Sequence, residues 1–373
     1  MKVVIAIDSF KGSMTSMEAG NAVKKGILAA KPDAEVVVNP LADGGEGTVD
    51  ALIEGLGAKK IPVTVTGPLG EKVSCYYGFL EETKTAVMEM ASAAGITLVT
   101  KKDPLRASTY GVGEMIADAL KRGCKNFMIG IGGSATNDGG IGMLKALGFE
   151  FFDEDGNDVG EGAAALAKIE VIRTENKNPL LSGAKFQIAC DVKNPLCGKQ
   201  GATYIFGPQK GVTEEQKEQV DEAMRHYADV TKESLDCDFA DCEGAGAAGG
   251  LGYAFLSYLA GELIPGVELI LHATGLEEKM KNADVVVTGE GRLDAQTVMG
   301  KAPVGVAALA KKYNAKVIAF AGSVAPEASV CNQAGIDAFF PIVRGVTTLE
   351  EAMKKENAME NIAATAEQVF RLL

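Results

Sequence analysis

The run KVVIAID at residues 2–8 constrains the fold of this chain more than any other feature. It is almost continuously apolar, which is typical of a strand buried on both faces of a parallel sheet. Helical spacing follows at residues 15–30, and the sequence then predicts a second strand at 34–42 and a second helix from about 46 to 56. This β-α-β-α order is the start of a doubly wound α/β sheet.

The same alternation returns near the other end of the chain. Strands are predicted at 284–289, 315–322 and 336–343, with helices between them and after the last one. The middle has a different rhythm: residues 63–67, 73–80 and 85–90 predict an antiparallel meander, followed by further helices and strands. We therefore expect a doubly wound domain made of residues 1–62 and 275–373. Residues 63–274 are expected to form an inserted second α/β domain that contains antiparallel strands.

Composition excludes several classes of protein. The 373 residues carry a net charge of −13, and no Lys/Arg stripe offsets it, so nucleic acid and anionic membranes are not expected partners. The seven cysteines form no CxxC pair, which suits a reducing compartment. There is no signal-peptide pattern and no apolar run as long as the ~18 residues of a membrane span. A cytoplasmic protein is therefore expected, as a monomer or homodimer.

The stretch GGSATNDGG at 132–140 is the strongest candidate for a phosphate-binding loop. It lies between a predicted strand and a predicted helix, where backbone N–H groups and the helix dipole can hold an anion. We expect it to contact the phosphates of ATP through Gly132, Gly133, Ser134, Asn137 and Gly139. The alternative is an ordinary glycine-rich turn.

Four further stretches place charged side chains at predicted strand ends, where doubly wound sheets bind their ligands. They are DSFKGS (8–13), ADGGEG (42–47), CDVKNPLCG (190–198) and TGEGRLDAQT (288–297). Each also has a structural interpretation as a capped loop, a turn or an internal ion pair. Together they supply carboxylates and cations without a nucleophilic Cys–His or Ser–His pair, which favours phosphoryl transfer.

The familiar nucleotide motifs are missing. Gly300-Lys301 is the nearest approach to GxxxxGK[ST], but positions 295 and 302 are both alanine. The stretch GAGAAG (244–249) fits GxGxxG but does not follow a strand, so it predicts a tight glycine entry into a helix at 250–259. An NAD-linked dehydrogenase is therefore disfavoured.

Six motifs in order along the chain resemble the class I glycerate kinases. They are DSFKGS, PLADGGEGT, GIGGSATNDGG, CDVKNPL, GAGAAGGLG and GEGRLDAQTVMGKAP. The resemblance implies ATP-dependent phosphorylation of D-glycerate with Mg²⁺, and it favours 2-phosphoglycerate as the product. It also implies a flavodoxin-like domain built from both chain ends, with an inserted domain likened to restriction-enzyme folds.

Residue roles follow from side-chain chemistry, with the active site expected in the cleft between the domains. Arg292 can bind the glycerate carboxylate through two parallel hydrogen bonds. Ser9 and Lys11 can serve the substrate or the phosphates. Asp191 is the first choice for the base that accepts the hydroxyl proton, and Asp294 is the second.

The remaining carboxylates are candidates for the metal, which is expected to keep several waters. They are Asp43, which is also a candidate for substrate binding, Asp138 and Glu290. Two alternatives for the function stay open: a kinase of another small hydroxy acid, and a sugar-acid sensor without turnover.

Overall fold

The computed structural model describes residues 1–42 and 48–373, so Asp43 lies outside the described residues. The chain divides into two units. Unit 1 comprises Met1–Asp43, Asp50–Ala58 and Val267–Leu373, and unit 2 comprises Gly44–Val49 and Lys59–Gly266. The chain therefore leaves unit 1 after Ala58 and returns at Val267, where the sequence suggested boundaries after residues 62 and 274.

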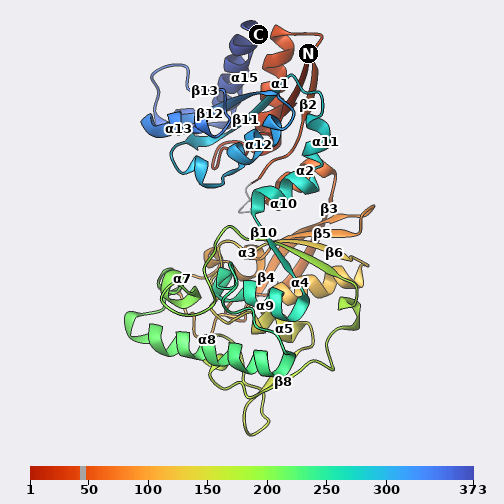
Figure 1. Ribbon diagram of the computed structural model, residues 1–373, viewed down its shortest axis with the longest axis vertical. Coiled ribbons are helices and arrows are strands. Elements are labelled where there is room, and N and C mark those ends of the chain that lie inside the picture. Colours follow the sequence, from red (N-terminus) through yellow and green to blue (C-terminus); the bar gives the residue numbers. More distant parts are fainter. Residues whose placement is uncertain (43–47) are drawn as a thin grey trace. The chain divides into compact units, whose positions relative to one another are not determined.

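Unit 1 contains, within the described residues, a five-stranded sheet in the order β2-β1-β11-β12-β13 with every neighbouring pair parallel. Numbered along this unit alone, the order is 2-1-3-4-5, the order of flavodoxin-like folds. The bounds are β1 Lys2–Ile5, β2 Glu35–Val38, β11 Val285–Leu293, β12 Lys316–Val324 and β13 Ala338–Pro341. The predicted doubly wound sheet is confirmed (Figure 1).

Helices cover both faces of this sheet, which is why its strands are apolar at successive positions. Val3 and Ile5 belong to a buried cluster with α1 and α15, whereas Val4 and Ala6 belong to a cluster with α12. A Thr15–Glu18 capping box starts α1. The helices of this unit are α1 Ser16–Ala30, α2 Thr48–Leu56, α10 Gly266–Ala273, α11 Leu276–Met280, α12 Ala302–Lys311, α13 Val330–Gln333, α14 Leu349–Met353 and α15 Lys355–Arg371.

Unit 2 has, over the described residues, a six-stranded sheet in the order β10-β9-β6-β5-β4-β3. The pairs β3/β4 and β4/β5 are antiparallel, so the predicted meander is confirmed, and the other pairs are parallel. The bounds are β3 Lys59–Thr66, β4 Lys72–Leu80, β5 Thr85–Glu89, β6 Asn126–Gly130, β9 Lys185–Ala189 and β10 Glu262–Ile264, with a separate antiparallel pair of β7 Glu150–Phe152 and β8 Val171–Arg173.

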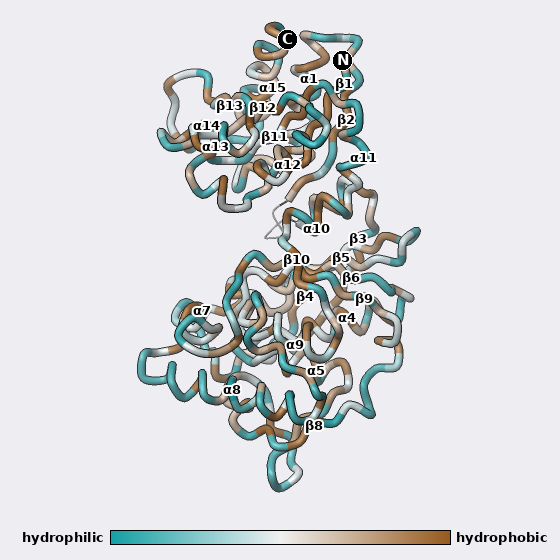
Figure 2. The backbone as a smooth tube through the Cα atoms, in the orientation of Figure 1, coloured by the Kyte–Doolittle hydropathy of each residue, from teal (hydrophilic) through white to brown (hydrophobic). Residues whose placement is uncertain are grey.

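One apolar core holds this unit together, and the polar outer faces of its helices meet solvent. The long helix α8 is mostly hydrophilic in Figure 2, yet Val220, Met224 and Tyr227 bury one stripe of it. The helices are α3 Ala91–Ala94, α4 Tyr110–Lys121, α5 Ile141–Ala146, α6 Ala163–Leu166, α7 Ala202–Lys210, α8 Glu214–Leu235 and α9 Leu251–Leu259. Among the residues that the structure describes, no helix combines the length and apolar character that a membrane span needs.

Strand β11 differs from its prediction, because it continues past residue 289 to Leu293. Pairing with β12 extends the strand: Glu290 lies opposite Ala321 and Arg292 opposite Ser323. Such pairing between distant segments overrides a polar sequence that, taken alone, indicates a loop. Glu290 and Arg292 are therefore held by a sheet rather than carried on a loop.

Candidate functional site

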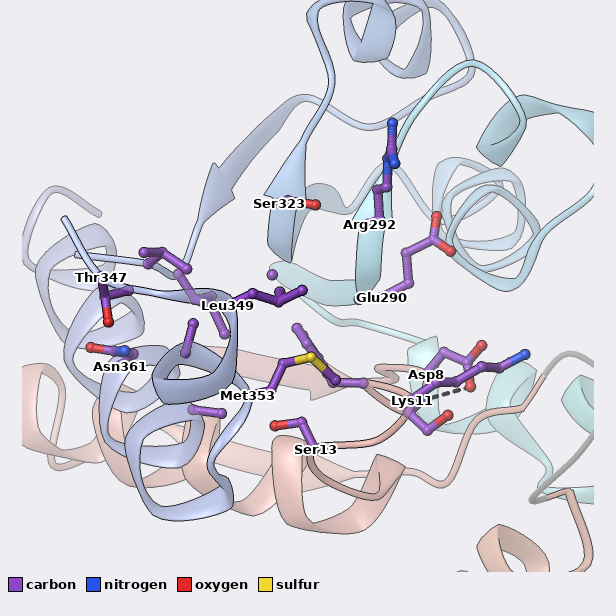
Figure 3. A pocket seen from close by; sticks show the side chains of 18 of the residues that line it. Asp8, Lys11, Ser13, Glu290, Arg292, Ser323, Thr347, Leu349, Met353 and Asn361 are labelled. Atoms are coloured by element: carbon purple, nitrogen blue, oxygen red, sulfur yellow. Dashed lines mark hydrogen bonds between the residues drawn. The ribbon is translucent and has the colours of Figure 1, made fainter. Parts of the chain in front are cut away.

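The polar residues of unit 1 meet at the carboxyl edge of its sheet. Strands β1 and β11 are neighbours in space, and the strand order reverses direction between them, which is where sheets of this kind bind ligands. A pocket of about 550 Å³ opens here and is lined by residues 8–11 after β1 and by Glu290 and Arg292 on β11 (Figure 3). The structure thus brings together Ser9, Lys11, Glu290 and Arg292.

The segment after β1 is tightly folded. The Asp8 carboxylate accepts a hydrogen bond of 2.7 Å from the Ser9 N–H, and Asp8 is 7% exposed. A turn from Phe10 to Met14 follows, because the Phe10 N–H donates to the Met14 carbonyl and the Ser13 N–H to the Phe10 carbonyl. The sequence analysis assigned no role to Asp8. Its position as the first charged residue after a buried strand could have identified it as a site residue.

Glu290 is, like Asp8, a buried carboxylate of this pocket. Its Oε1 accepts a hydrogen bond of 2.6 Å from the Thr297 hydroxyl, and its Oε2 lies 3.6 Å from the Lys301 Nζ. Burial raises the pKa of Glu290, while the Thr297 hydrogen bond and the Lys301 charge oppose that rise. The carboxylate is therefore held in one orientation with a cation beside it.

Three charged groups continue along the same edge. The Asp294 carboxylate lies 3.6 Å from the Arg292 Nε and 3.8 Å from the Lys301 Nζ. The Arg292 side chain is 67% exposed and the Asp294 side chain 18%. Asp294 also accepts a hydrogen bond of 2.9 Å from the Gln296 N–H, so it holds its own turn as well as the two cations.

Sequence reasoning missed Lys301 as a site residue. The sequence around Gly300-Lys301 does not fit a phosphate-binding loop, and the structure agrees. Such a loop would follow a strand directly, whereas a short 3₁₀ turn at Thr297–Met299 precedes Gly300. Lys301 nevertheless lines the pocket next to Glu290. Its place within the motif GEGRLDAQTVMGKAP was the signal that could have found it.

The glycine loop of unit 2 follows β6 and has an exposed part and a buried part. Gly132 and Gly133 are exposed, and a Cβ at Gly132 would meet no atom within 4 Å. Within the described part of the chain, neither of their N–H groups donates a hydrogen bond. Gly133 has a φ of +75°, which glycine adopts readily. These two residues can approach an anion with their backbone.

The structure places the rest of this loop inside the unit. Ser134 is 6% exposed and Asn137 0%, with the Asn137 Nδ2 donating to the Thr203 hydroxyl at 3.0 Å. Gly139 is buried too, and its N–H donates to the Gly249 carbonyl. Ser134, Asn137 and Gly139 therefore lie in the interior of unit 2, whereas Gly132 and Gly133 are exposed.

Asp138, expected to bind metal, is 0% exposed. Its Oδ2 accepts hydrogen bonds of 2.8 Å from both the N–H and the hydroxyl of Thr109, and its Oδ1 accepts from the Gly140 N–H. Burial raises its pKa, and these hydrogen bonds oppose the rise. The Asp138 carboxylate therefore joins the start of α4 to the glycine loop in the interior of unit 2, and its role as a metal ligand stays a prediction.

Two residues that the sequence analysis did not assign to the site, Lys210 and Gly249, pack against the glycine loop. The Lys210 Nζ donates to the Thr136 carbonyl at 2.6 Å, and burial lowers the pKa of this lysine to about 7 while the Asp138 charge opposes the shift. A Cβ at Gly249 would come within 2.2 Å of the same carbonyl. The GAGAAG stretch enters helix α9, as predicted, and its last glycine packs directly against the glycine loop.

Asp191 follows β9, the strand next to β6. Gly130 lies opposite Ala189 in the register of these parallel strands, so Gly132 and Asp191 each lie two residues past a matched pair. Asp191 is exposed, and its Oδ1 accepts a hydrogen bond of 2.9 Å from the Gly266 N–H. The structure therefore brings Gly132, Gly133 and Asp191 to one edge of unit 2.

The candidates thus form two sets, one on each unit. The set on unit 1 comprises Ser9, Lys11, Glu290, Arg292 and Asp294, joined by Asp8 and Lys301; the set on unit 2 comprises Gly132, Gly133 and Asp191. The expectation of one active site in a cleft between the domains stays a prediction. Over the described residues, no three or more His, Cys, Asp or Glu side chains cluster closely enough to hold a metal ion by themselves.

Known proteins resemble this chain along its whole length. Residues 3–373 match the family model of the glycerate kinase family. A glycerate 2-kinase of Escherichia coli K12 is 46% identical over 98% of both chains, and a glycerate kinase of Bacillus subtilis 168 is 45% identical over 99% of this chain and 97% of the relative. A crystal structure of a candidate glycerate kinase 2 from Salmonella typhimurium LT2 superposes with a TM-score of 0.92 at 44% identity, over 99% of this chain and 97% of that one. With these matches and its flavodoxin-like strand order, the chain belongs to the glycerate kinase family and is an enzyme of that family.

Proposed function

We propose that this enzyme transfers the γ-phosphoryl group of ATP to the 2-hydroxyl of D-glycerate. Support comes from the full-length similarity to a protein named glycerate 2-kinase. The observation that carries the proposal is the pocket of unit 1, where the cationic side chains of Lys11, Arg292 and Lys301 line one cavity with the buried Glu290. Phosphoryl transfer needs this combination, because it depends on positioning and charge stabilisation.

The glycerate carboxylate is assigned to Arg292. Its guanidinium is largely exposed on a strand, and its Nε lies 3.6 Å from the Asp294 Oδ2, so the guanidinium N–H groups can donate to a ligand. A planar guanidinium can hold a carboxylate through two parallel hydrogen bonds. Lys11 and Ser9, at the adjacent strand end, are assigned to the substrate hydroxyls and the transferred phosphoryl group.

The residues of this pocket also fit a bound Mg²⁺. Magnesium is usually held by one or two carboxylates together with substrate phosphates, so it does not require a closed cluster of protein ligands. Asp8 and Glu290 both line the pocket, and their oxygens are the donor type that magnesium prefers. Mg²⁺ held by these residues would offset the negative charge of the phosphates. Glu290 is the first candidate to hold it and Asp8 the second.

Unit 2 is assigned the proton transfer and part of the phosphate binding. The exposed N–H groups of Gly132 and Gly133 can donate to phosphate oxygens of ATP. In the reaction, the 2-hydroxyl oxygen forms a bond to the γ-phosphorus, the bond from that phosphorus to the β–γ bridging oxygen breaks, and ADP leaves. Asp191 accepts the hydroxyl proton, and Asp294 is the alternative base.

Phosphorus NMR of a mixture of protein, D-glycerate, ATP and MgCl₂ tests the reaction, the substrate and the position together. We expect ADP and 2-phosphoglycerate to appear only when all components are present. Formation of 3-phosphoglycerate would overturn the assigned position, and turnover with another hydroxy acid alone would overturn the substrate. Glycerate binding without any ADP release would identify a sensor instead of a kinase.

A further inference from the structure

The pocket of unit 1 has an apolar end that glycerate does not need. Its volume is about 550 Å³, within the range of ~300 to 1,000 Å³ typical of sites for larger organic ligands. The apolar lining includes Ile342, Leu349, Ala352 and Met353, and Figure 3 shows Leu349 and Met353 between the charged residues and Asn361. Glycerate is a three-carbon acid with a polar group on every carbon, so it has no apolar surface to place against such a wall.

Polar groups without a partner lie within this apolar region. The Ser13 hydroxyl oxygen is buried and forms no hydrogen bond within the described residues. The side chains of Thr347 and Asn361 also form no hydrogen bond with any residue that the structure describes. Figure 3 shows Thr347 and Asn361 at the end of the pocket opposite Glu290 and Arg292. A ligand here would meet an apolar wall together with a few directed donors and acceptors.

We infer that this apolar end binds the adenine base and ribose of ATP, with the triphosphate extending toward Lys11 and Lys301. The inference deepens the proposed function and rests on it. A nucleotide has a flat heteroaromatic part and a strongly anionic part, and the pocket has an apolar end and a cationic end in the same cavity. The carboxamide of Asn361 offers one acceptor and two donors, which can pair with the N6 amino group and a ring nitrogen of adenine.

The short helix α14 and the start of α15 form the wall at this end of the pocket. The Thr348 hydroxyl accepts a hydrogen bond from the Glu351 N–H and caps α14, which carries Ala352 and Met353. The Asn357 side chain, at the start of α15, donates to the Glu351 carbonyl. The wall is therefore a capped helix fixed to α15, on which Asn361 lies one turn further along.

Two variants of the full-length protein test the inference. Ala352→Phe enlarges a half-buried side chain that lines the apolar end of the pocket. Asn361→Ala removes the carboxamide. The matched controls are Ala364→Phe, on α15 but outside this pocket, and Asn21→Ala, on the exposed face of α1.

Calorimetric binding of ADP without glycerate is the first measurement. We expect Asn361→Ala to weaken ADP binding by roughly 5- to 20-fold, the range of one directed polar contact to a base. We expect Ala352→Phe to weaken it at least as much, because a ring cannot share the space with a base. The two controls should bind ADP as the unchanged protein does, and a thermal melt of each variant verifies folding.

Steady-state kinetics is the second measurement. KM for ATP should rise in both pocket variants while KM for D-glycerate stays the same, and Asn361→Ala should narrow the preference for ATP over GTP. If KM for glycerate rises and ADP binding is unchanged, this end belongs to glycerate and the inference is overturned. If the unchanged protein binds ADP here but does not phosphorylate glycerate, the proposed function fails while the nucleotide subsite stands.

Discussion

Replacing Arg292 with alanine separates carboxylate recognition from stabilisation of the transferred phosphoryl group. The side chain is 67% exposed, and its Nε lies 3.6 Å from an Asp294 oxygen, beyond ordinary hydrogen-bond distance. An exposed ion pair of this kind contributes about 0 to 1 kcal/mol to stability. Arg292→Ala should therefore fold normally, so that a change in kinetics reports on the site itself.

The size of the kinetic effect follows from what the guanidinium loses. In the proposed complex it pairs with the glycerate carboxylate, and by analogy with other hydrogen-bonded charge pairs the loss of one partner costs about 2 to 4 kcal/mol. That cost is a loss of roughly 30- to 1,000-fold in kcat/KM for glycerate. Because the carboxylate is present in both the ground state and the transition state, most of the loss should appear in KM for glycerate.

The assay is steady-state kinetics with both substrates varied, on the unchanged protein, Arg292→Ala and Arg292→Lys. The lysine variant keeps the charge but not the two parallel donors, so it should recover only part of the binding. Arg371→Ala, which removes an exposed arginine paired with Glu367 on α15, is the matched control and should behave as the unchanged protein. The reasoning is refuted if KM for glycerate stays constant while kcat collapses, because Arg292 then serves the phosphoryl group.

Three further changes test other parts of the molecule. Asp191→Asn keeps an oxygen that can accept from the Gly266 N–H at 2.9 Å, so it should fold but lose ~10² to 10⁴-fold in kcat with ADP binding intact; near-normal turnover would leave Asp191 a structural role only. Gly289→Ala places a Cβ 2.0 Å from the Phe320 carbonyl oxygen, so urea unfolding should show a loss of about 2 to 3 kcal/mol, whereas Gly345→Ala, which meets no atom within 4 Å, should be neutral. Burial lowers the pKa of Lys210 from 10.5 in the unfolded chain to about 7, so the folded protein binds fewer protons than the unfolded chain between these pH values. The free energy of unfolding should therefore rise with pH across that interval. It should rise less in Lys210→Met, and equal slopes for the two proteins would contradict the assignment.

The sequence alone determined that unit 1 holds five strands of a doubly wound sheet and that unit 2 holds an antiparallel meander, for a physical reason. A strand covered by helices on both faces must be apolar at successive positions, and Val3, Val4 and Ile5 meet that requirement. The antiparallel meander was equally readable from its turns. Because loops at the carboxyl ends of parallel strands gather at one edge, the sequence also indicated the edge of the sheet where Ser9, Lys11 and Arg292 line one pocket.

Only the tertiary structure decided which polar residues line a pocket or are exposed, and which are buried. Gly132 and Asp138 belong to one loop, and the sequence makes both of them candidates for ligand binding. The Asp138 carboxylate is buried, however, because it accepts hydrogen bonds from Thr109 in a distant segment. In the same way, pairing with β12 carries Arg292 into a sheet, and a turn brings the Lys301 Nζ to 3.6 Å from Glu290. These orientations depend on contacts between residues far apart in the chain, and local composition and spacing carry no record of such contacts.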